Sequence, residues 1–230
     1  MNRIAILAVI AVLMFGSSAT AHPDSINRVS MAPGQIALEV TGQVDNFGTP
    51  APLGSSTQFG YLSFANGIPS IFTDSNPANQ NEHTAVFTFV TEVNTERVTA
   101  NAANGGPFSI IIRTGTTTIY LASSGADFTD PASFASGTPI QVSEIRQQVI
   151  VDNAEKTFTV ENLNTITSSV PFTLNGSRFQ LGGVGEGFRT SLVGVLTVRS
   201  GATPPPTGYF GGYAVGVAPA TRRQSAKGPF

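Results

Sequence analysis

Residues 84–93 read TAVFTFVTEV, a stretch in which apolar and polar residues alternate. Side chains along a β-strand alternate between two faces, so Phe87 and Phe89 share one face. We expect that face to point into the core. Similar alternating stretches recur along the chain, separated by clusters of Gly, Asn, Pro and Asp, which is typical of an all-β domain. At most a short helical turn is expected, at residues 131–135.

Strands are expected at residues 36–44, 58–65, 84–93, 108–114, 117–123, 140–151, 157–167, 171–174, 178–181 and 189–199. Mostly short turns join them, which makes successive strands antiparallel neighbours. A barrel and a two-sheet sandwich both bury alternate residues and limit exposed strand edges. The short connections favour a single antiparallel β-barrel of about eight strands, and a two-sheet β-sandwich is the alternative.

Two stretches predict finer detail. Asn175-Gly176 is the strongest hairpin signal, because both residues tolerate the positive φ angles of a two-residue turn. That turn sets Phe172 opposite Phe179. In residues 189–199 both faces are half apolar, and we therefore expect this strand to be covered on each side.

The chain divides into four segments. Residues 1–21 form a signal-peptide pattern, with an apolar run shorter than the roughly 20 residues that span a bilayer and small residues before a cut after Ala21. A polar lead follows at 22–34, then the β-domain at 35–200. Residues 201–230 are rich in Gly and Pro and are expected to form a flexible tail, with an edge strand near 209–217 as the alternative. These features predict a secreted or periplasmic bacterial protein without stable membrane insertion after cleavage.

Composition excludes several classes of function. The formal charge is −2 with only 11% charged residues, which argues against a nucleic-acid partner because no basic stripe is available for phosphates. The chain has no cysteine, so disulfides, thiol catalysis and a lipid anchor on cysteine are excluded.

Two metal sites are conceivable, although no cofactor is needed to explain the chain. Cleavage after Ala21 would make His22 the mature N-terminus, where its amine and ring nitrogen could bind copper together with His83. This arrangement resembles the histidine brace of secreted lytic polysaccharide monooxygenases and periplasmic copper-carrier sandwiches, and the resemblance implies a copper site. The alternative is that His22 is an ordinary surface histidine in the polar lead.

A calcium site is a separate possibility that the loop 74–83 raises. Asp74 and Asn76 offer the oxygen ligands that calcium prefers. The alternative is that their side chains cap the backbone of a turn.

The candidate ligand-binding residues lie on predicted strands: Arg113, Tyr120, Glu144 and Arg146. Glu144 and Arg146 share a face and are expected to form an ion pair on a solvated or lumen face. No catalytic constellation is evident. We therefore expect an exported, non-enzymatic β-domain that binds a small apolar ligand, a polymer or a partner protein. One alternative is a secreted enzyme, and its most specific version uses the copper site at His22 and His83. The other alternative is a structural cell-surface or matrix protein.

Overall fold

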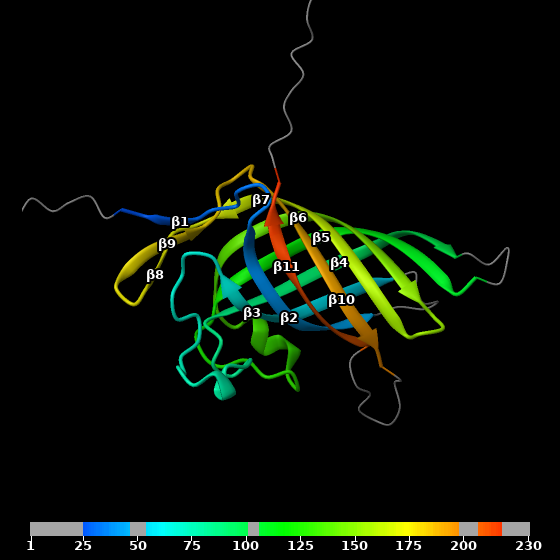
Figure 1. Ribbon diagram of the computed structural model, residues 1–230, viewed down its shortest axis with the longest axis horizontal. Coiled ribbons are helices and arrows are strands. Elements are labelled where there is room, and N and C mark those ends of the chain that lie inside the picture. Colours follow the sequence, from blue (N-terminus) through cyan, green and yellow to red (C-terminus); the bar gives the residue numbers. More distant parts are fainter. Residues whose placement is uncertain (1–24, 47–53, 101–105, 198–206, 218–230) are drawn as a thin grey trace, which may run out of the picture.

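The computed structural model describes residues 25–46, 54–100, 106–197 and 207–217. Eight antiparallel strands form a closed barrel in the order β10-β11-β2-β3-β4-β5-β6-β7, with β7 pairing back to β10 (Figure 1). Their bounds are β2 Ile36–Asn46, β3 Ser55–Ala65, β4 Phe87–Ala100, β5 Phe108–Leu121, β6 Thr138–Asp152, β7 Thr157–Ser169, β10 Gly187–Leu196 and β11 Gly208–Gly216. The predicted eight-stranded barrel is confirmed, and the sandwich alternative is wrong.

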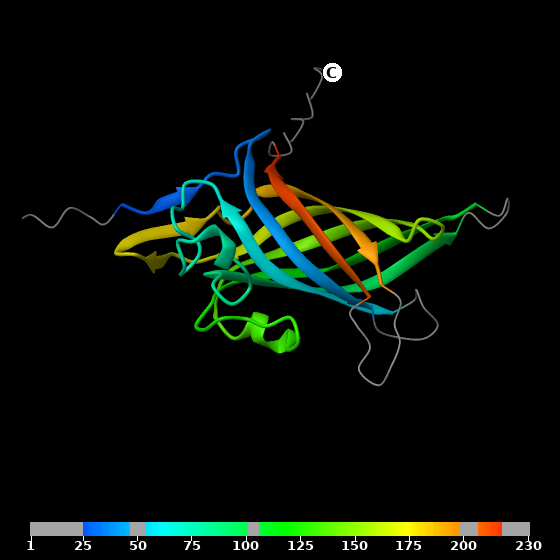
Figure 2. The same cartoon turned by 60° about the horizontal axis from the view of Figure 1, so that its bottom comes forward.

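A small second sheet lies at one end of the barrel (Figures 1 and 2). It has the order β1-β9-β8, with β1 at Asn27–Val29, β8 at Phe172–Leu174 and β9 at Ser177–Leu181. The predicted hairpin is confirmed, because Phe172 pairs with Phe179 and the turn residues Asn175 and Gly176 have φ of 50° and 78°. The apolar side chains of this sheet join the same core cluster as those of the barrel.

One aromatic contact and one hydrogen bond connect the small sheet to the barrel. The rings of Phe172 and Phe87 meet edge to face with centroids 5.4 Å apart. The amide Nε2 of Gln141 donates to the carbonyl of Leu181 at 2.7 Å. We call this end of the barrel the covered end. At the opposite end, which we call the distal end, β2 finishes at Asn46 and β10 at Leu196.

Three element boundaries differ from the predicted ones. The two strands expected at 108–114 and 117–123 are one strand, β5, because Gly115 lets β4 approach closely: a Cβ there would lie 1.9 Å from the carbonyl oxygen of Glu92. β11 lies within the expected tail and is a barrel strand between β10 and β2, not an edge. β1 lies within the expected polar lead.

The inner face of the barrel is mostly apolar, as expected for β4, where Phe87 and Phe89 are buried. In β10, Leu192 is buried, but Val193 and Val195 point outward and are 65% and 51% exposed. The expectation that this strand is covered on both sides is therefore wrong for the described part of the chain. Its outer valines fit the β-branched preference of strands without being needed for the core.

Short helical segments pack outside the barrel. The expected turn forms the 3-10 helix η3, Pro131–Ala135, and a second one, η1, spans Pro77–Asn79. η3 is held to β4 because the hydroxyl of Thr88 donates to the carbonyl of Phe134 at 2.7 Å. None of the helices in the described ranges is long and apolar enough to cross a membrane.

Candidate binding site inside the barrel

The interior of the barrel is not completely filled. Two chambers lie along its axis, and each leaves about 40 Å³ for the centres of water-sized molecules, which is room for a small molecule only. The inner chamber lies between residues such as Leu38, Phe89 and Leu192. The outer chamber lies toward the distal end, between Val44, Val151 and Leu196. Both chambers are lined by Gln58 and Phe210, which mark the boundary between them.

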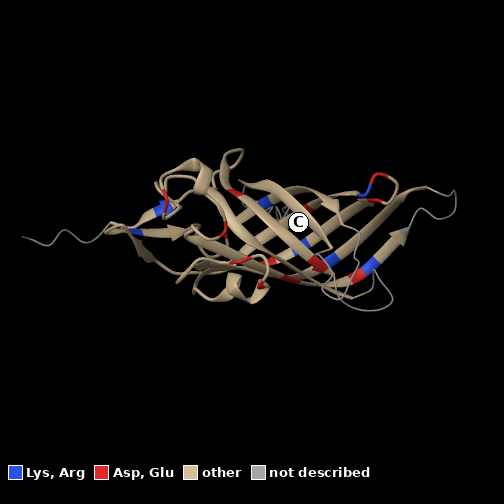
Figure 3. Cartoon of the chain, turned by 90° about the horizontal axis from the view of Figure 1, so that it is seen from below, with Lys and Arg blue, Asp and Glu red and all other residues tan. Residues whose placement is uncertain are grey.

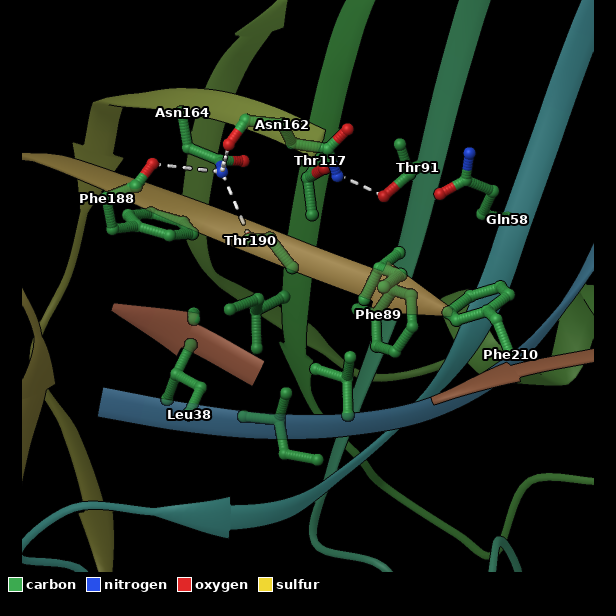
Figure 4. A pocket seen from close by; sticks show the side chains of 15 residues that line it. Leu38, Gln58, Phe89, Thr91, Thr117, Asn162, Asn164, Phe188, Thr190 and Phe210 are labelled. Atoms are coloured by element: carbon green, nitrogen blue, oxygen red, sulfur yellow. Dashed lines mark hydrogen bonds between the residues drawn. The ribbon is translucent and has the colours of Figure 1, made fainter. Parts of the chain in front are cut away.

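Polar side chains in the inner chamber are largely paired with one another (Figure 4). The amide Nδ2 of Asn164 donates to the carbonyl of Phe188 at 3.2 Å and to the hydroxyl of Thr190 at 3.1 Å. The hydroxyls of Thr91 and Thr117 form a hydrogen bond of 2.7 Å. These pairs satisfy buried polar atoms and stabilise the local geometry of the chamber wall.

Arg113 is the one charged residue in the lining of the outer chamber. It extends from β5 into the lumen and is 5% exposed. Its Nε donates to the hydroxyl of Thr95 at 3.2 Å, its Nη1 to Oε1 of Gln147 at 3.4 Å and its Nη2 to Oδ1 of Asn46 at 3.0 Å. Removal from water lowers the pKa of Arg113 to about 10, so the guanidinium remains charged at neutral pH.

The charge of Arg113 is not balanced within the described residues. No Asp or Glu lines either chamber, and no described carboxylate lies within ion-pair distance of the guanidinium. Gln147 connects Arg113 to a further polar residue, since its Nε2 donates to Oδ1 of Asn162 at 3.0 Å. An isolated cation in a dry interior is unfavourable unless a counter-charge reaches it.

Gln58 is a buried polar residue of the lumen that lines both chambers. Its side chain is 3% exposed and forms no hydrogen bond with any part of the chain that the structure describes. Ser56 lies two residues earlier on the same face of β3, and its hydroxyl is also buried without a partner. Buried amides and hydroxyls are normally hydrogen-bonded, so these groups need a water or a ligand.

The four predicted ligand-binding residues do not gather in one place. Arg113 points into the lumen, whereas Glu144 and Arg146 are exposed on the outside of β6. Arg146 pairs with Glu96 of β4 at 3.5 Å, not with Glu144. Tyr120 stands opposite Thr88 in the ladder, on the side that faces η3. Strand alternation directs these three residues away from the lumen, so they do not share a site with Arg113.

Gln58, Gln147 and Asn162 were missed by the sequence reasoning. A detectable signal existed for Gln147, which is a polar residue on the buried side of an alternating strand. Gln147 lies between Ile145 and Val149, which both face inward. Such a residue must find a partner inside the core or leave a polar atom unsatisfied.

The structure describes three of the four proposed metal ligands, His83, Asp74 and Asn76. His22 lies outside the described residues, and the side chain of His83 is 57% exposed, with its Nε2 3.6 Å from Oε1 of Glu82. Asp74 accepts hydrogen bonds from the backbone of Asn76 at 2.8 Å and from the side chain of Asn79 at 2.7 Å, and these bonds lower its pKa. Within the described ranges, no group of three or more His, Asp or Glu residues could hold a metal ion.

Fold and site together define a closed eight-stranded antiparallel barrel with a partly polar lumen. Comparisons with protein-family models, with curated proteins and with solved structures gave no match. Any proposal about function therefore depends on the chemistry of the lumen.

Proposed function

We propose that the chain is an exported, non-enzymatic β-barrel that binds a small molecule in its lumen. The observation that supports this most directly is Gln58, a buried amide without a partner among the described residues, located where two chambers meet. Small barrels can hold one ligand in their interior. A few polar groups in an otherwise apolar cavity are the usual composition of such a site.

Size and polarity limit the ligand. A drug-sized molecule needs a cavity of roughly 300 Å³ or more, and each chamber is far smaller. The proposed ligand therefore has only a few heavy atoms. The walls of the outer chamber include Ile111, Val149 and Phe158, which suits a molecule with an apolar end.

The lining also supports a binding function over a catalytic one. General acid–base catalysis needs a titratable group near the reacting atoms, usually His, Asp or Glu, and neither chamber lining contains one. The copper enzyme with His22 as a ligand remains a prediction, since that residue is not described. Export likewise rests on the sequence pattern of residues 1–21.

The distribution of charge is consistent with a barrel surrounded by water. Figure 3 shows the charged positions of the described residues spread thinly over strands and loops, without the run of basic positions that would favour nucleic acid. The outer face carries Glu144, Arg146, Glu161 and Arg189. Apolar residues such as Val193 and Val195 are also exposed there.

Titration of labelled protein with 1-propanol, followed by NMR, tests the proposal. We expect saturable shifts of the side-chain amide signals of Gln58 and Asn162. In Ala214→Val the added methyl groups occupy the inner chamber, so the shifts of Asn162 should weaken. Val193→Thr, on the outer face, serves as the control and should leave them unchanged. Shifts that stay linear with concentration, or that map to the outer face, would contradict binding in the lumen.

A further inference from the structure

We infer that the outer chamber selects a short-chain monocarboxylate, with Arg113 as the residue that binds its carboxylate. This inference rests on the proposed function and adds the chemical class of the ligand. It follows from three features of the described residues: the unused donors of Arg113, the absence of an internal counter-charge, and the apolar walls of the chamber.

Some N–H donors of the Arg113 guanidinium have no partner among the described residues. Arginine carries five N–H groups, and Arg113 uses three of them toward Thr95, Gln147 and Asn46. One hydrogen on each terminal nitrogen is left without a partner among the described residues. A carboxylate can accept two parallel hydrogen bonds from a guanidinium, which is the geometry that arginine recognises best.

Its surroundings also fix the guanidinium in position. The three acceptors come from β2, β4 and β6, so the planar group is held by three different strands of a closed sheet. Little side-chain entropy is left to lose on binding, which favours recognition of even a small ligand.

The charge of the lumen favours an anion. Arg113 is the single ionisable side chain in the linings of the two chambers, and the described carboxylates lie elsewhere. A cation would be repelled, and a neutral molecule would leave the buried positive charge unbalanced. A monoanion neutralises it, whereas a doubly charged anion would leave a net negative charge in a dry chamber.

The walls and the volume of the outer chamber determine which hydrocarbon group the carboxylate ligand can carry. Val151, Phe158 and Leu196 are apolar, so they match a hydrocarbon end better than the hydrated surface of an inorganic anion. The small volume of the chamber restricts the ligand to an acid with a chain of a few carbons. Propanoate is therefore the appropriate probe.

Calorimetry and NMR titrations with propanoate, 1-propanol, propylammonium and chloride at pH 7 test the inference. We expect propanoate to bind at least about tenfold more tightly than 1-propanol, because charge-assisted hydrogen bonds are stronger than neutral ones. In Arg113→Met this preference should disappear while 1-propanol still binds. Arg146→Met removes the same charge from the outer surface and should keep the preference.

A second variant tests the inference in case Arg113→Met does not fold. Gln147→Glu keeps Arg113 and places a carboxylate beside it, so it should abolish propanoate binding without loss of the far-ultraviolet circular dichroism of strands. Equal affinity for propanoate and 1-propanol, or an unchanged preference in Arg113→Met, would overturn the carboxylate assignment but leave the proposed function intact. Chloride that competes with propanoate at equal affinity would also overturn it. If neither propanoate nor 1-propanol binds, the proposed function itself is wrong.

Discussion

The ring of Phe158 on β7 lies directly against Gly194 on β10, so that a Cβ at residue 194 would come within 2.3 Å of the ring atom Cζ. The same Cβ would lie 2.4 Å from the carbonyl oxygen of Tyr209 on β11. Neighbouring strands therefore approach at a point where only a glycine fits. Phe158 in turn forms part of the outer-chamber wall.

Gly194→Ala is expected to lower the free energy of unfolding by about 1–3 kcal/mol, because overpacking forces the ring and the backbone to move. Thermal unfolding should show a decrease of several degrees in Tm. Gly211→Ala is a matched control on the adjacent strand, since the nearest atom to its Cβ is 3.6 Å away. A variant at residue 194 as stable as the control would contradict the close packing.

The turn at Gly176 gives a second prediction. Its φ of 78° is unfavourable for a residue with a side chain, so Gly176→Ala should destabilise the hairpin by about 1 kcal/mol. Because β9 packs over the covered end, hydrogen exchange at Leu181 should become faster. Ser177→Ala, next to the turn, should leave the exchange rate nearly unchanged. Equal rates in both variants would argue against the observed turn.

The opposite orientations of Leu192 and Val193 can be tested directly. The double variant Val193→Thr with Val195→Thr should change the free energy of unfolding by no more than about 0.5 kcal/mol per site, because both valines are exposed and threonine retains β-branching. Leu192→Thr buries a hydroxyl in the core and should cost at least about 2 kcal/mol. Similar losses in both proteins would mean that the two faces are wrongly assigned.

The pKa of Arg113 predicts how stability depends on alkaline pH. The folded protein releases this proton near pH 10, whereas an unfolded chain retains it up to the higher, ordinary pKa of an arginine. Between these values the unfolded state binds more protons, so the contribution of Arg113 to the free energy of unfolding increases as the pH rises. Comparing denaturant unfolding of the parent with Arg113→Met from pH 9 to 11 isolates this contribution. A constant difference between the two proteins would contradict the lowered pKa.

Binding of propanoate should show a different pH profile. The ligand is ionised above about pH 5 and Arg113 is charged below about 10, so affinity should be constant between about pH 6 and 9 and decrease above about 10. Titrations at several pH values, with 1-propanol as the uncharged reference, check this. Affinity that changes in parallel for both ligands would point to a general change in the barrel.

The sequence predicted the barrel because its strongest signals are local. Alternation in β4 identified the buried phenylalanines, and Asn175-Gly176 fixed the hairpin register. Gly115 was misleading, because a glycine between threonines resembles a turn although here it permits close strand contact. β11 was assigned to a tail since its glycines weaken the strand pattern, and its pairing with β2 is far from local.

The candidate binding site was harder to predict from the sequence than the fold. Arg113 and Tyr120 were expected on two separate strands, and only the single strand β5 shows that they lie on opposite faces. Arg146 points outward because its neighbours Ile145 and Gln147 face inward. The hydrogen bonds from Arg113 to Asn46 and Gln147 span 67 and 34 residues. Only closure of the barrel brings such distant groups together.

The position of β11 between β10 and β2 also has a consequence for synthesis and folding. The barrel cannot close until residues 208–216 have been made, and before then β2 and β10 each expose an unpaired edge. Contacts of such sequence separation form slowly. A nascent chain therefore stays open until nearly all of the described residues have been made. Until then its two free strand edges can pair with those of other chains and cause aggregation.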